Sequence, residues 1–139
     1  EIVAKCKPIA EKNGSKIIIT DDVHALDGVA NVIYTDVWLS LGEDKEKWGE
    51  RIKLLTPYRV TMDMMKSAAP GAVFLHCLPS FHDLNTSIAK DIHEEFGIEE
   101  MEVTNEVFES ERSLAFDEAE NRMHTIKAVL YLTLLKGQH

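Results

Sequence analysis

The chain has 139 residues, 45% of them hydrophobic, and its 15 Lys and Arg against 24 Asp and Glu give a formal net charge of −9 at pH 7. This length and composition suit one folded domain with a single core and argue against disorder. The acidic balance argues against nucleic acid or an anionic membrane as the main partner. Because the apolar stretches are shorter than the roughly 18 residues of a spanning helix, we expect no membrane span.

The cysteines and the start of the chain indicate where the protein works. Cys6 and Cys77 form neither a disulfide framework nor a CxxC metal motif. A reducing compartment is the simpler interpretation, so we expect a cytoplasmic protein. No secretory signal is found. The chain begins with Glu1 rather than Met and runs directly into a helical pattern, so we expect a fragment or processed piece of a longer protein.

Predicted helices and strands alternate in the first part of the chain. A helix is predicted over residues 1–13, and Pro8 is expected to kink or restart it. The β-branched run 16–20 predicts a buried strand. A short helix over 23–30 and a second strand over 31–35 follow.

The alternation continues to the end of the chain. The further predicted elements, in chain order, are a charged helix or loop over 40–56, a helix over 61–66 capped by Thr61, a strand over 72–76, a helix from 85 or 86 to 97, a strand over 101–104 and a helix over 117–135. Because the strands are continuous apolar runs between helices, they predict an α/β fold with a parallel sheet covered on both faces. The dinucleotide fingerprint GxGxxG, the phosphate loop of nucleotide-binding enzymes and the esterase motif GxSxG do not occur.

Ligands of open parallel sheets bind beyond the carboxyl ends of the strands, where this sequence places ionisable side chains. Asp36 follows the second predicted strand, His76 and Cys77 end the third, and Glu106 or a neighbour follows the fourth. Asp36 with the nearby Ser40 suits a ligand that carries both an ammonium group and a carboxylate. The alternative interpretation of Asp36 is a carboxylate that caps a loop.

Several roles are open to Cys77 at the end of its strand. A thiol there can act as a nucleophile, a metal ligand or a polar contact, and the alternative is a small buried hydrophobic side chain. His76 and His82 lie nearby in sequence, but no compact ligand spacing repeats, so a metal site is not expected. The Leu78-Pro79 bond can be cis and would then turn the preceding carbonyl toward a ligand.

The last predicted helix carries one further candidate residue and an unusual apolar pattern. Arg122 can bind an anionic or carbonyl oxygen, or it can pair with Glu118 four residues earlier. Residues 128–135 place apolar groups almost all around the helix, unlike a surface helix with one buried face. We therefore expect this helix to bury a second face against something outside the chain.

Several stretches of the sequence, taken together, resemble the ornithine carbamoyltransferases. They are 35–43, similar to the family's D-x-x-x-S-M-G loop with Leu41 in place of Met, 74–79 with 81–83, similar to its H-C-L-P signature, and 106–110 and 116–127, similar to its closing region. The stretches occur in one order and cover essentially the whole chain.

The resemblance implies a Rossmann-like parallel sheet flanked by helices, incomplete at its amino-terminal end. It makes residues 1–139 a partial ornithine-binding domain and leaves the family's amino-terminal carbamoyl-phosphate domain without a counterpart. The implied partners are L-ornithine, carbamoyl phosphate and that missing domain, in a cytoplasmic homotrimer, or a multiple of it, that serves arginine metabolism. No metal or organic cofactor is implied, and this chain alone is expected to be inactive.

In the implied reaction the δ-amine of L-ornithine attacks carbamoyl phosphate, and citrulline and phosphate leave. The amine must be unprotonated and the carbonyl polarised. Carried over by motif, Asp36 binds the amino group or groups of ornithine, and Ser40 and the Leu41 backbone orient its α-amino-acid end. Cys77 contacts the attacking amine. The Leu78 carbonyl accepts from the carbamoyl NH₂, and Arg122 holds the carbamoyl oxygen. Asp36, Cys77 and Arg122 form the implied catalytic set, in which Cys77 positions the amine and is not a covalent nucleophile.

Two alternatives remain open. A neighbouring enzyme, such as a carbamoyltransferase for putrescine or a related diamine or amino acid, would share these motifs, although residues 40–42 favour a substrate with a carboxylate. An aspartate carbamoyltransferase is disfavoured because Cys77 stands where that relative usually has proline. The alternative from another class is a catalytically silent amino-acid-binding module. For His76, His82 and Glu106, support of the fold and contact with substrate are equally expected.

Overall fold

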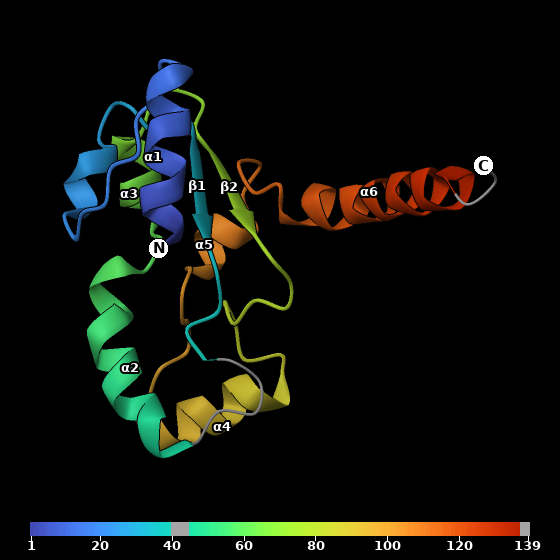
Figure 1. Cartoon of the computed structure of the whole chain (residues 1–139). Helices are drawn as coiled ribbons and strands as arrows, with labels where there is room; N and C mark the ends of the chain where they lie inside the picture. The colour runs from blue at the N-terminus through green and yellow to red at the C-terminus, as the bar shows by residue number, and fades with distance from the viewer. Residues whose placement is uncertain (40–44, 137–139) are drawn as a thin grey trace.

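The computed structural model describes residues 1–39 and 45–136, in which a small parallel sheet is combined with helices and α6 projects away from the rest (Figure 1). The helical elements in chain order are α1 (Ile2–Lys12), η1 (Val23–Leu26), η2 (Lys45–Lys47), α2 (Trp48–Leu55), η3 (Thr56–Tyr58), α3 (Met62–Ser67), α4 (Ser87–Phe96), α5 (Asn105–Phe108) and α6 (Ala115–Lys136), where η marks a 3₁₀ helix. Their alternation with parallel strands confirms the predicted α/β class.

The sheet consists of two parallel strands, β1 (Val32–Thr35) and β2 (Val73–His76). Both are short apolar runs rich in β-branched or aromatic residues, which suit a pleated, half-buried surface. The expected cover on both faces is wrong for β1, since Val32 and Tyr34 are about half exposed on the side away from Ile33. Thr35 lies opposite His76 in the register, so the two strands end at the same edge. The predicted strands over 31–35 and 72–76 are therefore confirmed to within one residue.

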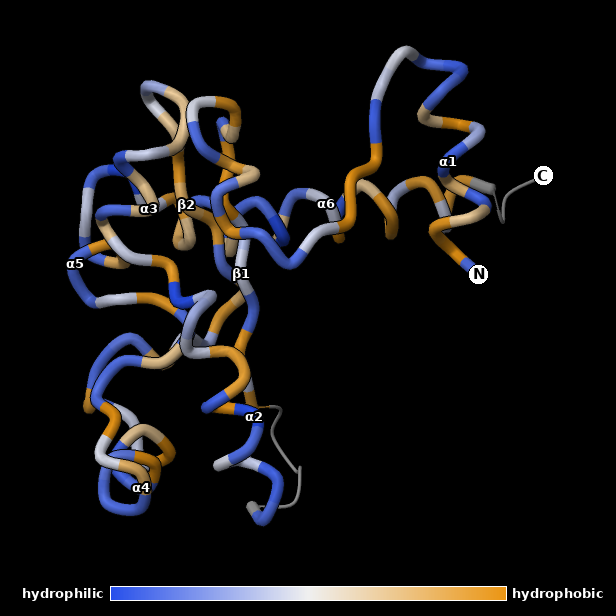
Figure 2. The backbone as a smooth tube through the Cα atoms, turned by 90° about the vertical axis from the view of Figure 1, so that its left-hand side faces the viewer, coloured by the Kyte–Doolittle hydropathy of each residue, from blue (hydrophilic) through white to orange (hydrophobic). Residues whose placement is uncertain are grey.

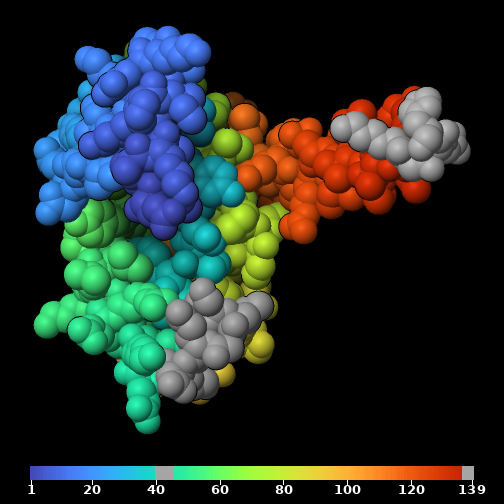
Figure 3. All heavy atoms as spheres, viewed as in Figure 1, coloured from blue at the N-terminus to red at the C-terminus, as the bar shows by residue number. Residues whose placement is uncertain are grey.

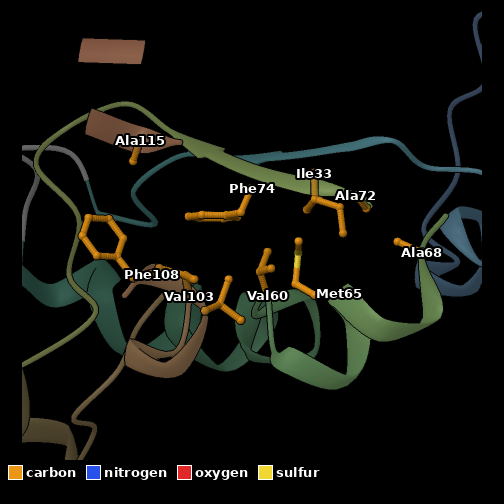
Figure 4. Close-up of a cluster of buried hydrophobic side chains, with 10 residues drawn as sticks. Ile33, Val60, Met65, Ala68, Ala72, Phe74, Val103, Phe108 and Ala115 are labelled. Atoms are coloured by element: carbon orange, nitrogen blue, oxygen red, sulfur yellow. The ribbon is translucent and has the colours of Figure 1, made fainter. Parts of the chain in front are cut away.

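The main core lies under one face of this sheet. Figure 4 shows Ile33 from β1 and Phe74 from β2 pointing toward Val60, Met65 and Val103 on the opposite side. Burying a large apolar side chain such as Phe74, which is fully buried, contributes roughly 1.5–3 kcal/mol. A second buried cluster joins α2 and α4 and consists of Trp38, Leu39, Trp48, Ile52, Phe81, Ala89, Ile92 and Met101.

Local capping signals account for two predicted helices. The Thr61 side chain accepts a hydrogen bond from the Met64 backbone N–H at the start of α3, and the Thr86 side chain accepts one from Ala89 at the start of α4. Each satisfies a backbone donor that has no partner within the helix. Gly97 ends α4 with φ of 70°, a left-handed conformation that favours glycine.

Two of the predicted strands do not form. Residues 16–20 have no regular structure, and Ile18 is 77% exposed. A strand needs a neighbouring strand for its backbone groups, and no described residue pairs with this segment. The predicted strand 101–104 is reduced to one isolated parallel bridge between Val60 and Val103, because the chain on the Val60 side turns directly into α3.

Three helix predictions also need adjustment. α1 runs through Pro8 as a single helix, so the chain does not restart there. The short helix expected over 23–30 is limited to the 3₁₀ helix η1, where the Asp22 side chain accepts a hydrogen bond from the His24 backbone N–H. In the polar segment 40–56, regular helix is found from η2 onward, and residues 40–44 lie outside the described part of the chain.

The last helix, α6, extends away from the rest of the molecule (Figures 1 and 3). Hydrophobic residues recur along it (Figure 2), and its exposed ones are Phe116, Met123, Ile126, Val129, Leu130, Tyr131, Leu132, Leu134 and Leu135. The chain exposes 10082 Å² of accessible surface, whereas a compact monomer of 15.7 kDa exposes about 7,300 Å². The predicted helix over 117–135 is thus confirmed, and much of its apolar surface is uncovered.

Within residues 1–39 and 45–136, no helix combines the length and the hydropathy that a membrane crossing would need.

Candidate functional site

The shared edge of β1 and β2 brings Asp36 and Cys77 together. Since Thr35 lies opposite His76, the residues that follow them leave the sheet side by side. The Cys77 thiol donates a hydrogen bond to Asp36 Oδ1 over 2.9 Å. The Val37 backbone N–H donates to the same carboxylate oxygen over 2.7 Å.

These hydrogen bonds shift the pKa values of Asp36 and Cys77 in opposite directions. The Cys77 thiol and then the Val37 N–H lower the pKa of Asp36 below its ordinary value of 3.8. The hydrogen bond to Asp36 and then partial burial raise the pKa of Cys77 above its ordinary value of 9.0. A nucleophilic cysteine needs its thiolate at neutral pH, so this thiol is suited to donating a hydrogen bond and not to covalent attack.

Cys77 and Leu78 line two cavities at this edge. The larger, of about 460 Å³, is also lined by Arg122. The smaller, of about 220 Å³, is also lined by Asp36. The larger cavity is completed by Tyr34, Glu118, Ala119, Asn121 and Thr125, and the smaller by Val37, Leu39, Pro79 and Phe81.

The start of α6 places Arg122 beside the end of β2. The Leu114 backbone N–H donates to the Phe74 carbonyl over 2.9 Å, which joins the segment before α6 to the strand. Among the described residues the Arg122 guanidinium has no hydrogen-bond or ion-pair partner. The pairing of Arg122 with Glu118 considered from the sequence is not formed, and Glu118 accepts a hydrogen bond from the Tyr34 side chain.

The Tyr34–Glu118 contact belongs to the site, although the sequence analysis did not select Tyr34. The hydrogen bond to Glu118, together with desolvation, raises the pKa of Tyr34 to about 12. Glu118 is thereby held in the same cavity as Arg122. The usable signals were the position of Tyr34 two residues before Asp36 and that of Glu118 one helical turn before Arg122.

The other candidates have different surroundings. Ser40 and Leu41 lie outside the described residues. His82 stacks on Phe108 with ring centroids 3.7 Å apart and contacts Asn105. Glu106 is exposed on α5.

The turn after β2 is held by contacts of buried side chains. The Leu78-Pro79 bond is cis, as the sequence analysis considered. His76 is fully buried and lies against Glu102, with its Nε2 atom 3.1 Å from Glu102 Oε1. Glu102 was not among the residues expected in the site from the sequence, and it lies in the stretch 101–104 that was predicted as a strand.

This edge is a candidate ligand-binding site of an α/β domain, where a carboxylate, a thiol and a guanidinium without a partner among the described residues gather at the strand ends. The family model of the aspartate/ornithine carbamoyltransferase Asp/Orn-binding domain matches residues 1–133. The chain therefore belongs to the aspartate/ornithine carbamoyltransferase family.

Individual relatives agree with this assignment. Over 96% of the chain, it is 58% identical to "Ornithine carbamoyltransferase 1, catabolic" of Staphylococcus epidermidis and 54% identical to "Ornithine carbamoyltransferase, catabolic" of Treponema denticola. It covers 41% and 40% of these two proteins, so the chain spans about two fifths of their length. The solved structure of the Pyrococcus furiosus ornithine carbamoyltransferase superposes on 93% of the chain with a TM-score of 0.70 at 35% identity, and 36% of that protein is covered.

Proposed function

We propose that this chain supplies the ornithine-binding half of an ornithine carbamoyltransferase. The observation that carries the proposal is the 2.9 Å contact between Cys77 and Asp36 beside the Arg122 cavity. In the reaction, the δ-nitrogen of L-ornithine forms a bond to the carbonyl carbon of carbamoyl phosphate. The bond from that carbon to the phosphate oxygen breaks, the nitrogen loses a proton, and citrulline and phosphate are released.

Each group has one task in this proposal. The Asp36 carboxylate, kept ionised by its low pKa, attracts the amino group of ornithine. Cys77 contacts the same nitrogen and aligns it for attack, which is a gain from orientation. The Leu78 carbonyl accepts from the carbamoyl NH₂.

Arg122 acts on the carbamoyl group in this proposal. Its guanidinium donates to the carbamoyl oxygen, where negative charge develops as the amine attacks. Ser40 and the Leu41 backbone hold the α-amino-acid end of ornithine. No metal or organic cofactor takes part in the proposed chemistry.

We further propose that a carbamoyl-phosphate domain works on the open side of this chain. The accessible surface exceeds that of a compact monomer by about 2,800 Å², which is enough for one side of a permanent interface. The exposed surface includes apolar residues of α6 such as Leu130 and Leu134. Residues 1–139 then act as a partial ornithine-binding domain that is inactive without the partner domain.

We also propose the compartment, the assembly and the metabolic role of the enzyme. The free thiols of Cys6 and Cys77 are compatible with the reducing cytoplasm. By the family resemblance, the complete enzyme is a homotrimer or a multiple of it and serves arginine metabolism. Light scattering on a fusion of this chain with the remaining part of a relative would report the subunit number.

A domain replacement tests the function. In this fusion protein, the chain replaces the matching segment of the Staphylococcus epidermidis relative, to which it is 58% identical. We expect the fusion to form citrulline from L-ornithine and carbamoyl phosphate, and the chain alone to form none. The unaltered relative is the positive control. A folded fusion that binds carbamoyl phosphate but makes no citrulline would refute the proposal.

The same fusion separates the alternatives. A carbamoyltransferase for putrescine would give a higher kcat/KM with that diamine than with ornithine. A silent module would bind ornithine, as measured by calorimetry, without turnover. We expect neither result, because the family's loop over 40–42 suits a substrate with an α-carboxylate.

A further inference from the structure

Glu102 and His76 are two ionisable side chains that are both 0% exposed. Their closest atoms, Glu102 Oε1 and His76 Nε2, are 3.1 Å apart, although they are poorly aligned for a hydrogen bond. Neither residue is among the described residues that line the two cavities. Burying such groups is unfavourable unless their partners compensate for lost water, so the partners indicate what the pair does.

Glu102 holds one end of the segment that carries Cys77 and Leu78. Its Oε1 atom accepts hydrogen bonds from the Phe81 backbone N–H over 2.8 Å and from the Ser80 hydroxyl over 3.1 Å. An ionised carboxylate makes stronger hydrogen bonds than a neutral acceptor does.

His76 holds the other end of the same segment. Its Nδ1 atom is in close contact with the Cys77 carbonyl oxygen. Because a carbonyl oxygen only accepts, Nδ1–H is the donor. His76 in turn packs against Glu102, so one buried carboxylate is connected to both ends of residues 77–81.

Glu102 is itself fixed to the core. The Val60 backbone N–H donates to the Glu102 carbonyl over 3.0 Å, and the Thr104 N–H donates to the Val60 carbonyl over 3.0 Å. The Met101 N–H donates to the Phe81 carbonyl over 2.9 Å. The carboxylate therefore ties the turn to a rigid part of the chain.

We propose that Glu102 is a positioning residue, which holds residues 77–81 at both ends and so keeps the Cys77 thiol and the Leu78 carbonyl in place beside Asp36. Its role in catalysis rests on the proposed carbamoyltransferase function. Its effect on Cys77 does not, because the contact between Cys77 and Asp36 can be followed without turnover.

The test uses Glu102→Gln in the fusion protein. The amide keeps an oxygen for Phe81 but is a weaker acceptor than an ionised carboxylate, so the turn should loosen. We expect kcat to fall at least tenfold with the KM for carbamoyl phosphate unchanged. Alkylation of Cys77 by iodoacetamide, followed by mass spectrometry on its peptide, should become several-fold faster as the thiol leaves Asp36.

Two further variants make the result decisive. Ser80→Ala removes one hydrogen bond to the same carboxylate and should change both readouts in the same direction by a smaller factor. It replaces Glu102→Gln as the deciding variant if that protein fails to fold. Met65→Ala, in the core beneath the sheet, is the matched control for lost stability and should leave kcat and the alkylation rate of Cys77 unchanged.

The outcomes separate the two proposals. If the unmodified fusion makes no citrulline, the proposed function fails, and the alkylation rate still decides whether Glu102 positions Cys77. If the fusion is active but Glu102→Gln or Ser80→Ala alters the melting temperature alone, as Met65→Ala does, the positioning role is overturned.

Discussion

The Cys77 thiol donates a hydrogen bond of 2.9 Å to the Asp36 carboxylate, although 41 positions separate the two residues in the chain. The contact exists because β1 and β2 are parallel neighbours that end in register. It leaves the thiol protonated and the carboxylate ionised. A polar pair of this kind can hold and orient an amine without forming a covalent bond to it.

The first prediction concerns the titration of Cys77. Only the thiolate is alkylated, and the hydrogen bond to Asp36 favours the neutral thiol, so the pKa of Cys77 lies above 9.0. The alkylation rate should therefore reach half its maximum above pH 9.0. In Asp36→Asn that midpoint should move down toward the ordinary value. An equal or higher midpoint in Asp36→Asn would show that the carboxylate does not control the thiol.

The second prediction is kinetic. In the active fusion, Cys77→Ala should raise the KM for ornithine and lower kcat by about tenfold, the effect of losing one hydrogen bond to a charged or reacting group. Cys77→Ser keeps a donor and should lose less. The matched control is Cys6→Ala in α1, which should match the unmodified fusion. Unchanged kinetics in Cys77→Ala would remove Cys77 from the site.

The third prediction concerns Arg122, which lines the larger cavity. Arg122→Met should lower kcat on the order of 100- to 1,000-fold, because a donor to a developing oxyanion is lost. Arg122→Lys should recover part of the rate, since lysine keeps the charge but not the planar fork. Lys127→Met, an exposed cation further along α6, is the control. Equal losses in Arg122→Met and Lys127→Met would indicate a general charge effect.

The fourth prediction concerns the core. Phe74 is fully buried at the centre of the main cluster, so Phe74→Ala should lower the free energy of unfolding by about 3–5 kcal/mol. Urea denaturation of the fusion would measure this. Leu54→Ala on the surface of α2 should change it by less than about 0.5 kcal/mol. A small loss at Phe74 would mean that the core is loosely packed.

The fifth prediction concerns the uncovered side of α6. The 139-residue chain alone should self-associate, because large exposed apolar patches favour association. The double variant Leu130→Lys with Leu134→Lys, one turn apart on this helix, should shift the chain toward monomer in light scattering. Leu54→Lys, at an exposed leucine elsewhere, should not. Persistent association of the double variant would place the contact on another surface.

Signals contained within a few residues were sufficient to predict most helices and the two strands that form. Thr61, Thr86 and Gly97 mark helix ends through hydrogen bonds or backbone angles that depend on three or four neighbours. The motifs around Asp36, Cys77 and Arg122 likewise identified the candidate site from sequence. Their assigned roles remain predictions.

Contacts between distant residues were decided by the tertiary structure. Residues 16–20 have the composition of a strand but no partner, and a strand exists only where another chain segment meets its backbone groups. Glu118 bonds to Tyr34 rather than to Arg122. The buried side chains of Glu102 and His76 lie against each other. Composition and spacing determined which groups the chain offers, whereas strand register and packing determined which of them meet, because those contacts depend on the whole fold.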